Sequence, residues 1–193
     1  MTVSCPSTTL YPSILSVPPI DRRLRGREKV LALSRHARHA LRMSCDRSNL
    51  ELDRLPKSEQ GVPLPVNGIH WSLSHKPAIV GGVAALLPVG LDIETIRPVK
   101  DGLLAKVADD DEWQLVGGRS PSDFFRFWTA KEAVLKAVGK GMAGLSRCRI
   151  VAVTDNIHMT LTYENAPWPV EHCWFGSHVA AITTHDWKVC WSI

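Results

Sequence analysis

The chain has 193 residues, of which 45% are hydrophobic and 22% are charged, so it can bury a core and is not intrinsically disordered. The formal net charge of +4 fits an anionic ligand or an acidic protein partner, and it is too small to indicate a nucleic-acid-binding protein. The five cysteines include no Cys-x-x-Cys pair, which indicates neither a zinc site nor a disulfide framework.

No segment of the sequence predicts export or membrane insertion. The N-terminus lacks the charged and apolar regions of a secretory signal. The longest uncharged apolar run, AIVGGVAALLPVGL at residues 78–91, is shorter than a membrane span and contains glycine and proline. We therefore expect a cytoplasmic protein that does not insert into a membrane.

The first part of the chain predicts one helix and two strands. Residues 1–20 are rich in Pro and Ser and predict an irregular or edge segment. Residues 21–43 predict a helix, and residues 56–67 a loop. Residues 69–75 alternate like a strand, and residues 78–86 predict a strand buried on both faces. The expected apolar stripe of the helix is Val30, Leu33, Ala37, Ala40 and Leu41.

The second part predicts two helices followed by strands. Residues 101–116 predict a helix that ends at the glycine pair 117–118. A stronger helix is expected from Pro121, which suits a first turn, to Val138, with Gly139 at its end. The strands are expected at residues 148–153, 157–163, 171–175, 178–184 and 187–192.

A weak internal echo suggests a repeat. The segment WSLSHKPAIVGGVAAL at residues 71–86 and the segment EHCWFGSHVAAITT at residues 171–184 share a strand–loop–strand plan. Two similar α/β halves, residues 1–88 and 89–193, explain a length between one domain and two. Chance similarity between strands rich in Ala and Val also explains the echo.

The segment VGLDIE at residues 89–94 places two carboxylates at the end of an apolar strand. Side chains alternate along a strand, so Asp92 and Glu94 share one face while Ile93 enters the core. Two carboxylates on one face repel each other unless a cation lies between them, and Mg²⁺ prefers oxygen ligands. Alone, a D-x-E pair is common and is more typical of two solvated acids at a strand end.

A second stretch, FFRFWTAKEAVLKAVGKGM at residues 124–142, supplies further charges. Glu132 and Lys136 are four residues apart on a helix, which is compatible with a surface ion pair. Lys131 and Lys140 are also present, and a Glu with several Lys suits a metal-bound pyrophosphate. A third stretch, WSLSH, ends on a hydroxyl and an imidazole that can contact phosphate.

Three ordered motifs resemble the 4′-phosphopantetheinyl transferase superfamily, and in it the larger, pseudo-dimeric, surfactin-synthetase-activating type. They are IHWSLSHK at residues 69–76, VGLDIETIRPV at residues 89–99 and FWTAKEAVLKAVGKG at residues 127–141. The resemblance implies an α/β (α+β) fold with two similar halves related by a pseudo-twofold, with coenzyme A bound between them. The implied enzyme is a holo-carrier-protein synthase. It transfers 4′-phosphopantetheine from coenzyme A to a serine of an apo acyl or peptidyl carrier protein and releases adenosine 3′,5′-bisphosphate.

The resemblance also implies roles for individual residues. Asp92, Glu94 and Glu132 would bind Mg²⁺, Glu132 would deprotonate the serine, and Lys136 would stabilise charge on the phosphate. One departure is Val62, in GVP, where the family often has a basic residue. The residues expected to bind coenzyme A are Lys29, Arg35, Ser74, His75, Lys131 and Lys136.

The resemblance implies a protein that acts as a monomer, and the positive charge of the chain fits an acidic carrier domain. Two other function classes are compatible with parts of the sequence. A non-catalytic relative that binds coenzyme A or a carrier protein is suggested only by Val62. A nucleic-acid-binding protein is suggested by the Arg-rich residues 22–42, but this segment has a helical apolar stripe and no interleaved aromatic residues.

Overall fold

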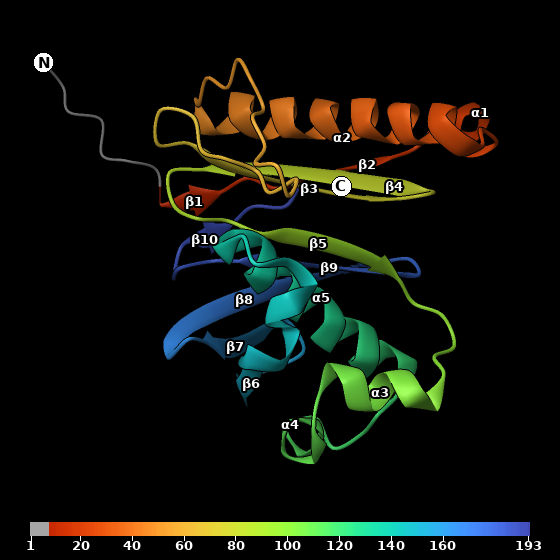
Figure 1. The fold of residues 1–193 in the computed structure, drawn as a ribbon, viewed down its shortest axis with the longest axis vertical. Helices are drawn as coiled ribbons and strands as arrows, with labels where there is room; N and C mark the ends of the chain where they lie inside the picture. The colour runs from red at the N-terminus through yellow and green to blue at the C-terminus, as the bar shows by residue number, and fades with distance from the viewer. Residues whose placement is uncertain (1–7) are drawn as a thin grey trace, which may run out of the picture.

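The computed structural model describes residues 8–193, which form two antiparallel sheets with helices on their outer faces (Figure 1). The smaller sheet has the strand order β2-β4-β3, and the larger has the order β5-β9-β8-β7-β6. Figure 1 shows α2 above the smaller sheet, and α5 with α3 and α4 on the side of the larger one. The predicted α+β class is confirmed, because helices and antiparallel sheets form separate layers.

The first part of the chain covers one face of the smaller sheet with a long helix. The helix α2 begins at Gly26, five residues later than predicted, and a separate short helix precedes it. Four residues of the expected stripe are buried, but Val30 is 59% exposed because burial of this helix against the sheet begins only at Ala32. The elements are β1 (Thr9–Leu10), β2 (Ser13–Ser16), α1 (Pro19–Arg22), α2 (Gly26–Ser48), β3 (His70–Lys76) and β4 (Ile79–Ala85).

The second part of the chain begins with a strand and then builds three helices. Its elements are β5 (Leu91–Thr95), α3 (Asp101–Val107), α4 (Asp110–Gln114), α5 (Pro121–Val138), η1 (Gly141–Arg147), β6 (Cys148–Val153), β7 (His158–Tyr163), β8 (Ala166–Phe175), β9 (His178–Thr183) and β10 (Lys188–Val189). The strand β8 is longer than predicted and β10 is shorter.

The prediction of one helix over residues 101–116 is wrong. The backbone is extended at Ala108, and a new helix begins after Asp109. The Asp109 side chain accepts from the backbone N–H of Glu112, and the Glu112 side chain accepts in return from the backbone N–H of Asp109. This reciprocal capping box satisfies donors at a helix start, so it favours two short helices over one long one.

The prediction of α5 is confirmed at both ends. Pro121 occupies its first turn, and Ser120 forms a capping box with Asp123. Gly139 closes the helix in the left-handed region with φ of 70°, which glycine adopts without strain. The amphipathic face of this helix packs on β5 and β9, so α5 is the main helix of the larger sheet.

The two sheets are tied together by short strands from the two ends of the described chain. The strand β1 pairs in parallel with β10, and the Ile14 backbone N–H donates to the Ser192 carbonyl at 2.7 Å. Both segments of the internal echo form antiparallel hairpins, β3–β4 and β8–β9. The division into two repeated halves at residue 88 remains a prediction. No helix within residues 8–193 is long and apolar enough to span a membrane.

Candidate active site

The start of β5 lies directly against α5, and this contact brings the two acidic motifs together. A Cβ added to Gly90 would lie 1.8 Å from the carbonyl oxygen of Ala133 on α5, so only glycine fits here. Val89 and Leu91 are buried, and Ile93 is buried as predicted. The backbone contact places Glu132 and Lys136 of α5 beside the carboxylates of β5.

Asp92 is almost completely buried, at 4% exposure, and lies at the centre of a polar network. Its Oδ1 accepts from the Ser74 hydroxyl at 3.0 Å and from Lys136 Nζ at 2.7 Å. Among residues 8–193, its Oδ2 has no hydrogen-bond partner. A buried acceptor without a donor is costly, so Asp92 retains one oxygen that a cation can satisfy.

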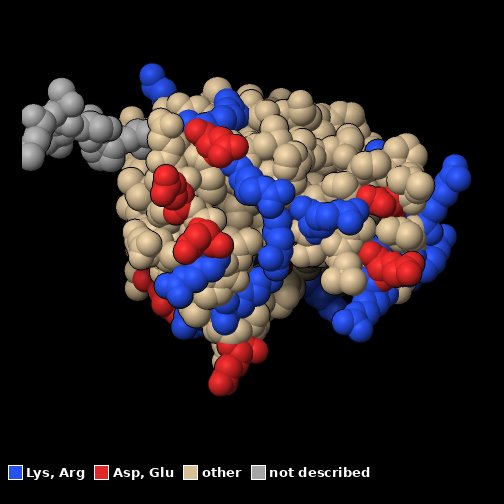
Figure 2. Space-filling view, turned by 90° about the horizontal axis from the view of Figure 1, so that it is seen from above, with Lys and Arg blue, Asp and Glu red and all other residues tan. Residues whose placement is uncertain are grey.

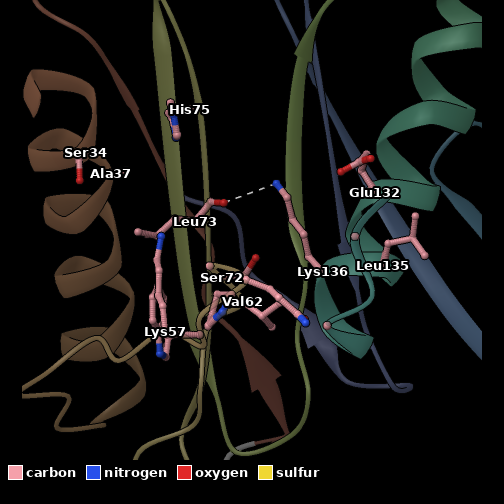
Figure 3. Close-up of a pocket in the computed structure, with 16 residues that line it drawn as sticks. Ser34, Ala37, Lys57, Val62, Ser72, Leu73, His75, Glu132, Leu135 and Lys136 are labelled. Atoms are coloured by element: carbon pink, nitrogen blue, oxygen red, sulfur yellow. Dashed lines mark hydrogen bonds between the residues drawn. The ribbon is translucent and has the colours of Figure 1, made fainter. Parts of the chain in front are cut away.

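Lys136 is held by the backbone of both neighbouring strands as well as by Asp92. Its Nζ donates to the Leu91 carbonyl at 2.9 Å. It also donates to the Leu73 carbonyl at 3.4 Å (Figure 3). These three contacts use the three donors of one ammonium group. The lysine is therefore fixed between β3 and β5 at the position where its positive charge faces the cavity.

Glu94, two residues along β5, is held by two side chains that the sequence analysis did not assign. Its Oε1 accepts from Lys76 Nζ at 2.7 Å and from the Trp128 indole N–H at 3.1 Å. Trp128 begins the WTAKE motif, so this motif also orients an acid on β5 from α5. The indole N–H of Trp128, within the segment FWTAKEAVLKAVGKG, was the available signal for this role.

Glu132 projects from α5 toward the same network, and its Oε1 is buried without a partner in the described part of the chain. Burial raises the pKa of the Glu132 carboxyl, and the neighbouring Asp92 carboxylate raises it further, whereas Lys136 acts in the opposite direction. Among the described residues, the neighbouring Asp92 and Glu132 therefore each have one buried acceptor oxygen without a donor.

Two adjoining cavities meet at these residues. One, of about 310 Å³, extends between α2, the loop around residue 61, β3 and α5 (Figure 3). The other, of about 460 Å³, contains Asp92, Glu94 and Trp128. His75, Glu132 and Lys136 line both cavities, so they lie at the junction.

The two residues at the end of β3 behave differently from each other. The Ser74 hydroxyl donates to Asp92 and accepts from the backbone N–H of Ile93 at 3.1 Å, so it ties β3 to β5 and orients the acid. His75 lies at the cavity rim, and its pKa is lowered by loss of water around the ring and then by the positive charges of Lys136 and Lys76. The imidazole is therefore neutral near pH 7.

Three residues expected to bind coenzyme A are not brought to the cavities. Lys131 Nζ lies 2.7 Å from Glu112 Oε1, and both side chains are buried, at 3% and 4% exposure. Arg35 is exposed and pairs with Asp21 at 3.2 Å. Neither Arg35 nor Lys29 lines the cavity, since α2 contributes Ser34 and Ala37 to it instead. Contacts of Lys29 and Arg35 with coenzyme A stay a prediction.

The three carboxylates have the chemistry of metal ligands, but their side chains are not arranged as a complete metal-binding group. Within residues 8–193, no group of three or more His, Cys, Asp or Glu side chains is arranged to hold a metal ion. Nevertheless Asp92 Oδ2 and Glu132 Oε1 are buried acceptors without donors, which is the environment that a hard divalent cation satisfies. The donor chemistry thus fits Mg²⁺.

Comparison with known proteins agrees with this arrangement of residues. Residues 88–190, just over half of the chain, match the family described as the 4′-phosphopantetheinyl transferase superfamily. Three similar proteins are named 4′-phosphopantetheinyl transferases. The gsp protein of Aneurinibacillus migulanus is 33% identical over 90 residues, which are 45% of this chain and 38% of the relative. The psf-1 protein of Bacillus pumilus is 36% identical over 86 residues, 42% of this chain and 37% of the relative. The HetI protein of a Nostoc species is 36% identical over 93 residues, 44% of this chain and 38% of the relative.

These alignments cover less than two fifths of the length of each relative. The family match includes β5, α5 and every strand of the larger sheet, and so includes all three candidate metal ligands. The chain therefore belongs to the 4′-phosphopantetheinyl transferase superfamily, and it resembles the larger, pseudo-dimeric type.

Proposed function

We propose that this protein is a holo-carrier-protein synthase that transfers 4′-phosphopantetheine from coenzyme A to a serine of an apo acyl or peptidyl carrier protein. One observation carries the proposal. Glu132 and Lys136 lie at the junction of two cavities, Asp92 and Glu94 line one of these cavities, and all four are inside the segment that matches the family. The carboxylate oxygens without donors suit a divalent cation, and the fixed lysines beside them suit a pyrophosphate.

Mg²⁺ is the cofactor that we propose for this site. Asp92, Glu94 and Glu132 would hold it, since two of them have buried acceptor atoms without donors. A bound Mg²⁺ supplies charge neutralisation for the pyrophosphate and stabilises the leaving bisphosphate. Glu94 would contribute the oxygen that the Lys76 and Trp128 donors do not engage.

The protein side chains would perform the remaining steps. Glu132 would take the proton from the serine hydroxyl. The serine oxygen forms a bond to the β-phosphorus, and the bond from that phosphorus to the bridging oxygen breaks, so the electron pair leaves with adenosine 3′,5′-bisphosphate. Lys136, fixed by β3 and β5, would stabilise the charge that develops on the transferred phosphate.

An acidic carrier domain is the partner that we propose. The helix α2 contains six Lys or Arg residues and two acids, and Figure 2 shows the basic side chains gathered on the face of the molecule seen from above α2. Such a face favours encounter with an acidic protein. A cytoplasmic location and action as a monomer are part of the same proposal.

Mass spectrometry of apo carrier proteins incubated with coenzyme A and Mg²⁺ tests the proposal. We expect the full chain to add one phosphopantetheinyl group to a carrier, and Asp92→Ala to lower the rate at least about a hundredfold, as expected when a transition-state charge loses its stabilising group. The matched control is Glu51→Ala, an exposed acid outside both cavities. Wild-type rates for Asp92→Ala would contradict the site.

The non-catalytic alternative has a different outcome. If the protein binds coenzyme A in calorimetry but modifies no apo carrier in a broad panel, it is a binding relative and not a transferase. The buried acids and the fixed lysine favour catalysis, because a protein that only binds coenzyme A does not require unsatisfied acceptors beside its phosphates.

A further inference from the structure

The loop between α2 and β3 folds back on itself beside the end of α5. Lys57 and Pro63 form an isolated antiparallel bridge, and the Ser58 backbone N–H donates to the Val62 carbonyl at 2.9 Å. The Val62 N–H also donates to the Ser58 hydroxyl at 3.2 Å. These bonds fix the backbone position of Lys57, which lies across the loop from Val62.

Val62 has a packing role that explains why this position carries no charge. A Cβ added to Gly139 would lie 3.0 Å from Val62 Cγ1, so the valine rests against the turn that ends α5. The valine is half-buried and lines the 310 Å³ cavity through its apolar side chain. Position 62 therefore contributes an apolar contact to the cavity and no charge.

Lys57 lines the same cavity and has no competing partner. Within residues 8–193 its side chain makes no ion pair or hydrogen bond, whereas Lys136 is engaged by Asp92 and two carbonyl groups. The charge of Lys57 is also one of those that lower the pKa of His75. Figure 3 shows Lys57 and Val62 on the loop side of the cavity, with Glu132 and Leu135 of α5 across from them.

We propose that Lys57 binds a phosphate group of the nucleotide substrate in this cavity. The inference rests on the proposed function, because it takes coenzyme A as the ligand. A flexible lysine at an open rim can follow a phosphate as a point charge without disturbing the acids at the junction. Its neighbour His75, neutral near pH 7, can add a hydrogen bond but little charge.

Calorimetric titration of the full chain with coenzyme A and with dephospho-coenzyme A tests this assignment. We expect Lys57→Met to weaken coenzyme A binding about tenfold, the loss of roughly one charge-assisted hydrogen bond at a partly solvated site. The matched control is Lys106→Met, an exposed lysine on α3 that lines neither cavity, and it should bind as the unaltered protein does. Adding Val62→Lys to Lys57→Met should recover part of the affinity, because the new charge faces the same cavity.

The outcomes separate this inference from the proposed function. A loss seen with coenzyme A but not with dephospho-coenzyme A assigns Lys57 to the 3′-phosphate, and an equal loss with both assigns it to the pyrophosphate. If the unaltered protein binds coenzyme A and Lys57→Met binds it equally tightly, the assignment is wrong while the proposed function stands. If the unaltered protein binds neither nucleotide, both are wrong.

Discussion

The buried ion pair between Lys131 and Glu112 provides a demanding test of how α4 is held against α5. Glu112 Oε1 accepts from Lys131 Nζ at 2.7 Å and from the Ile150 backbone N–H at 2.8 Å, and Oε2 accepts from the Asp109 N–H at 3.2 Å. We predict that Lys131→Met lowers the free energy of unfolding by about 3 kcal/mol, because it leaves a buried carboxylate without its cation. The two remaining amide donors keep the cost at the lower end of the usual range for a broken buried pair.

The matched double variant distinguishes the pair from simple loss of packing. In Lys131→Met with Glu112→Gln, no charge is buried, and the Gln carbonyl can still accept from Ile150. We expect the double variant to be more stable than the sum of the two single losses by at least about 1 kcal/mol. Urea denaturation at pH 7 measures all three variants, and the loss for Lys131→Met corresponds to a fall in Tm of about 6–12 °C.

Two results would refute this reasoning. One is additivity of the two single losses within about 0.5 kcal/mol, the usual margin for independent sites. The other is a coenzyme A affinity that falls in the double variant at a temperature where it is fully folded, because Lys131 would then contact the nucleotide as the sequence motif first suggested. The buried position of Lys131, at 3% exposure, predicts that affinity is unchanged.

Three further predictions follow from single residues. Glu132→Gln should remove transfer and stabilise the metal-free protein by about 1 kcal/mol, because it removes a buried negative charge beside Asp92. An unchanged midpoint in urea denaturation would contradict this. Gly90→Ala should cost more than about 3 kcal/mol or prevent folding, since the new Cβ would overlap the Ala133 carbonyl, and a well-folded variant by circular dichroism would show that β5 and α5 are less tightly packed than described. His172 is completely buried, and burial lowers its pKa from 6.5 to about 4, so the folded state binds fewer protons than the unfolded state between these values. Stability should therefore fall as the pH drops through that window, by up to roughly 3 kcal/mol, and His172→Gln should flatten the dependence in urea titrations at several pH values.

The elements that the sequence predicted best are those whose ends are marked by local chemistry. The bounds of α5 follow from Ser120, Pro121 and Gly139, whose capping and turn preferences act within a few residues. The break at Ala108 was missed, although the acidic run from Asp109 contains the capping box that produces it. The exposure of Val30 could not be predicted, because it depends on where the sheet lies along α2.

The residues of the candidate site also differ in how far the sequence predicts them. Asp92 and Glu132 were identified from motifs, and the structure places them beside one another through the Gly90 contact. The different roles of Lys131 and Lys136 could not be predicted, because both are lysines of one helix. Their roles differ because Lys131 faces α4 and Lys136 faces β5. Lys57 carried no sequence signal, because only the folding of its loop onto the end of α5 brings it to the cavity.

The parallel pairing of β1 with β10 has a consequence for attempts to divide this protein. The backbone N–H groups of Lys188 and Cys190 donate to the carbonyls of Thr8 and Leu10, at 3.0 Å and 2.9 Å. A chain cut between Leu86 and Leu87 would leave these bonds to join two separate polypeptides. We expect such fragments to reassemble when mixed and neither to behave as an independent folding unit, which makes the connection before β5 a suitable position for a split, reconstitutable protein.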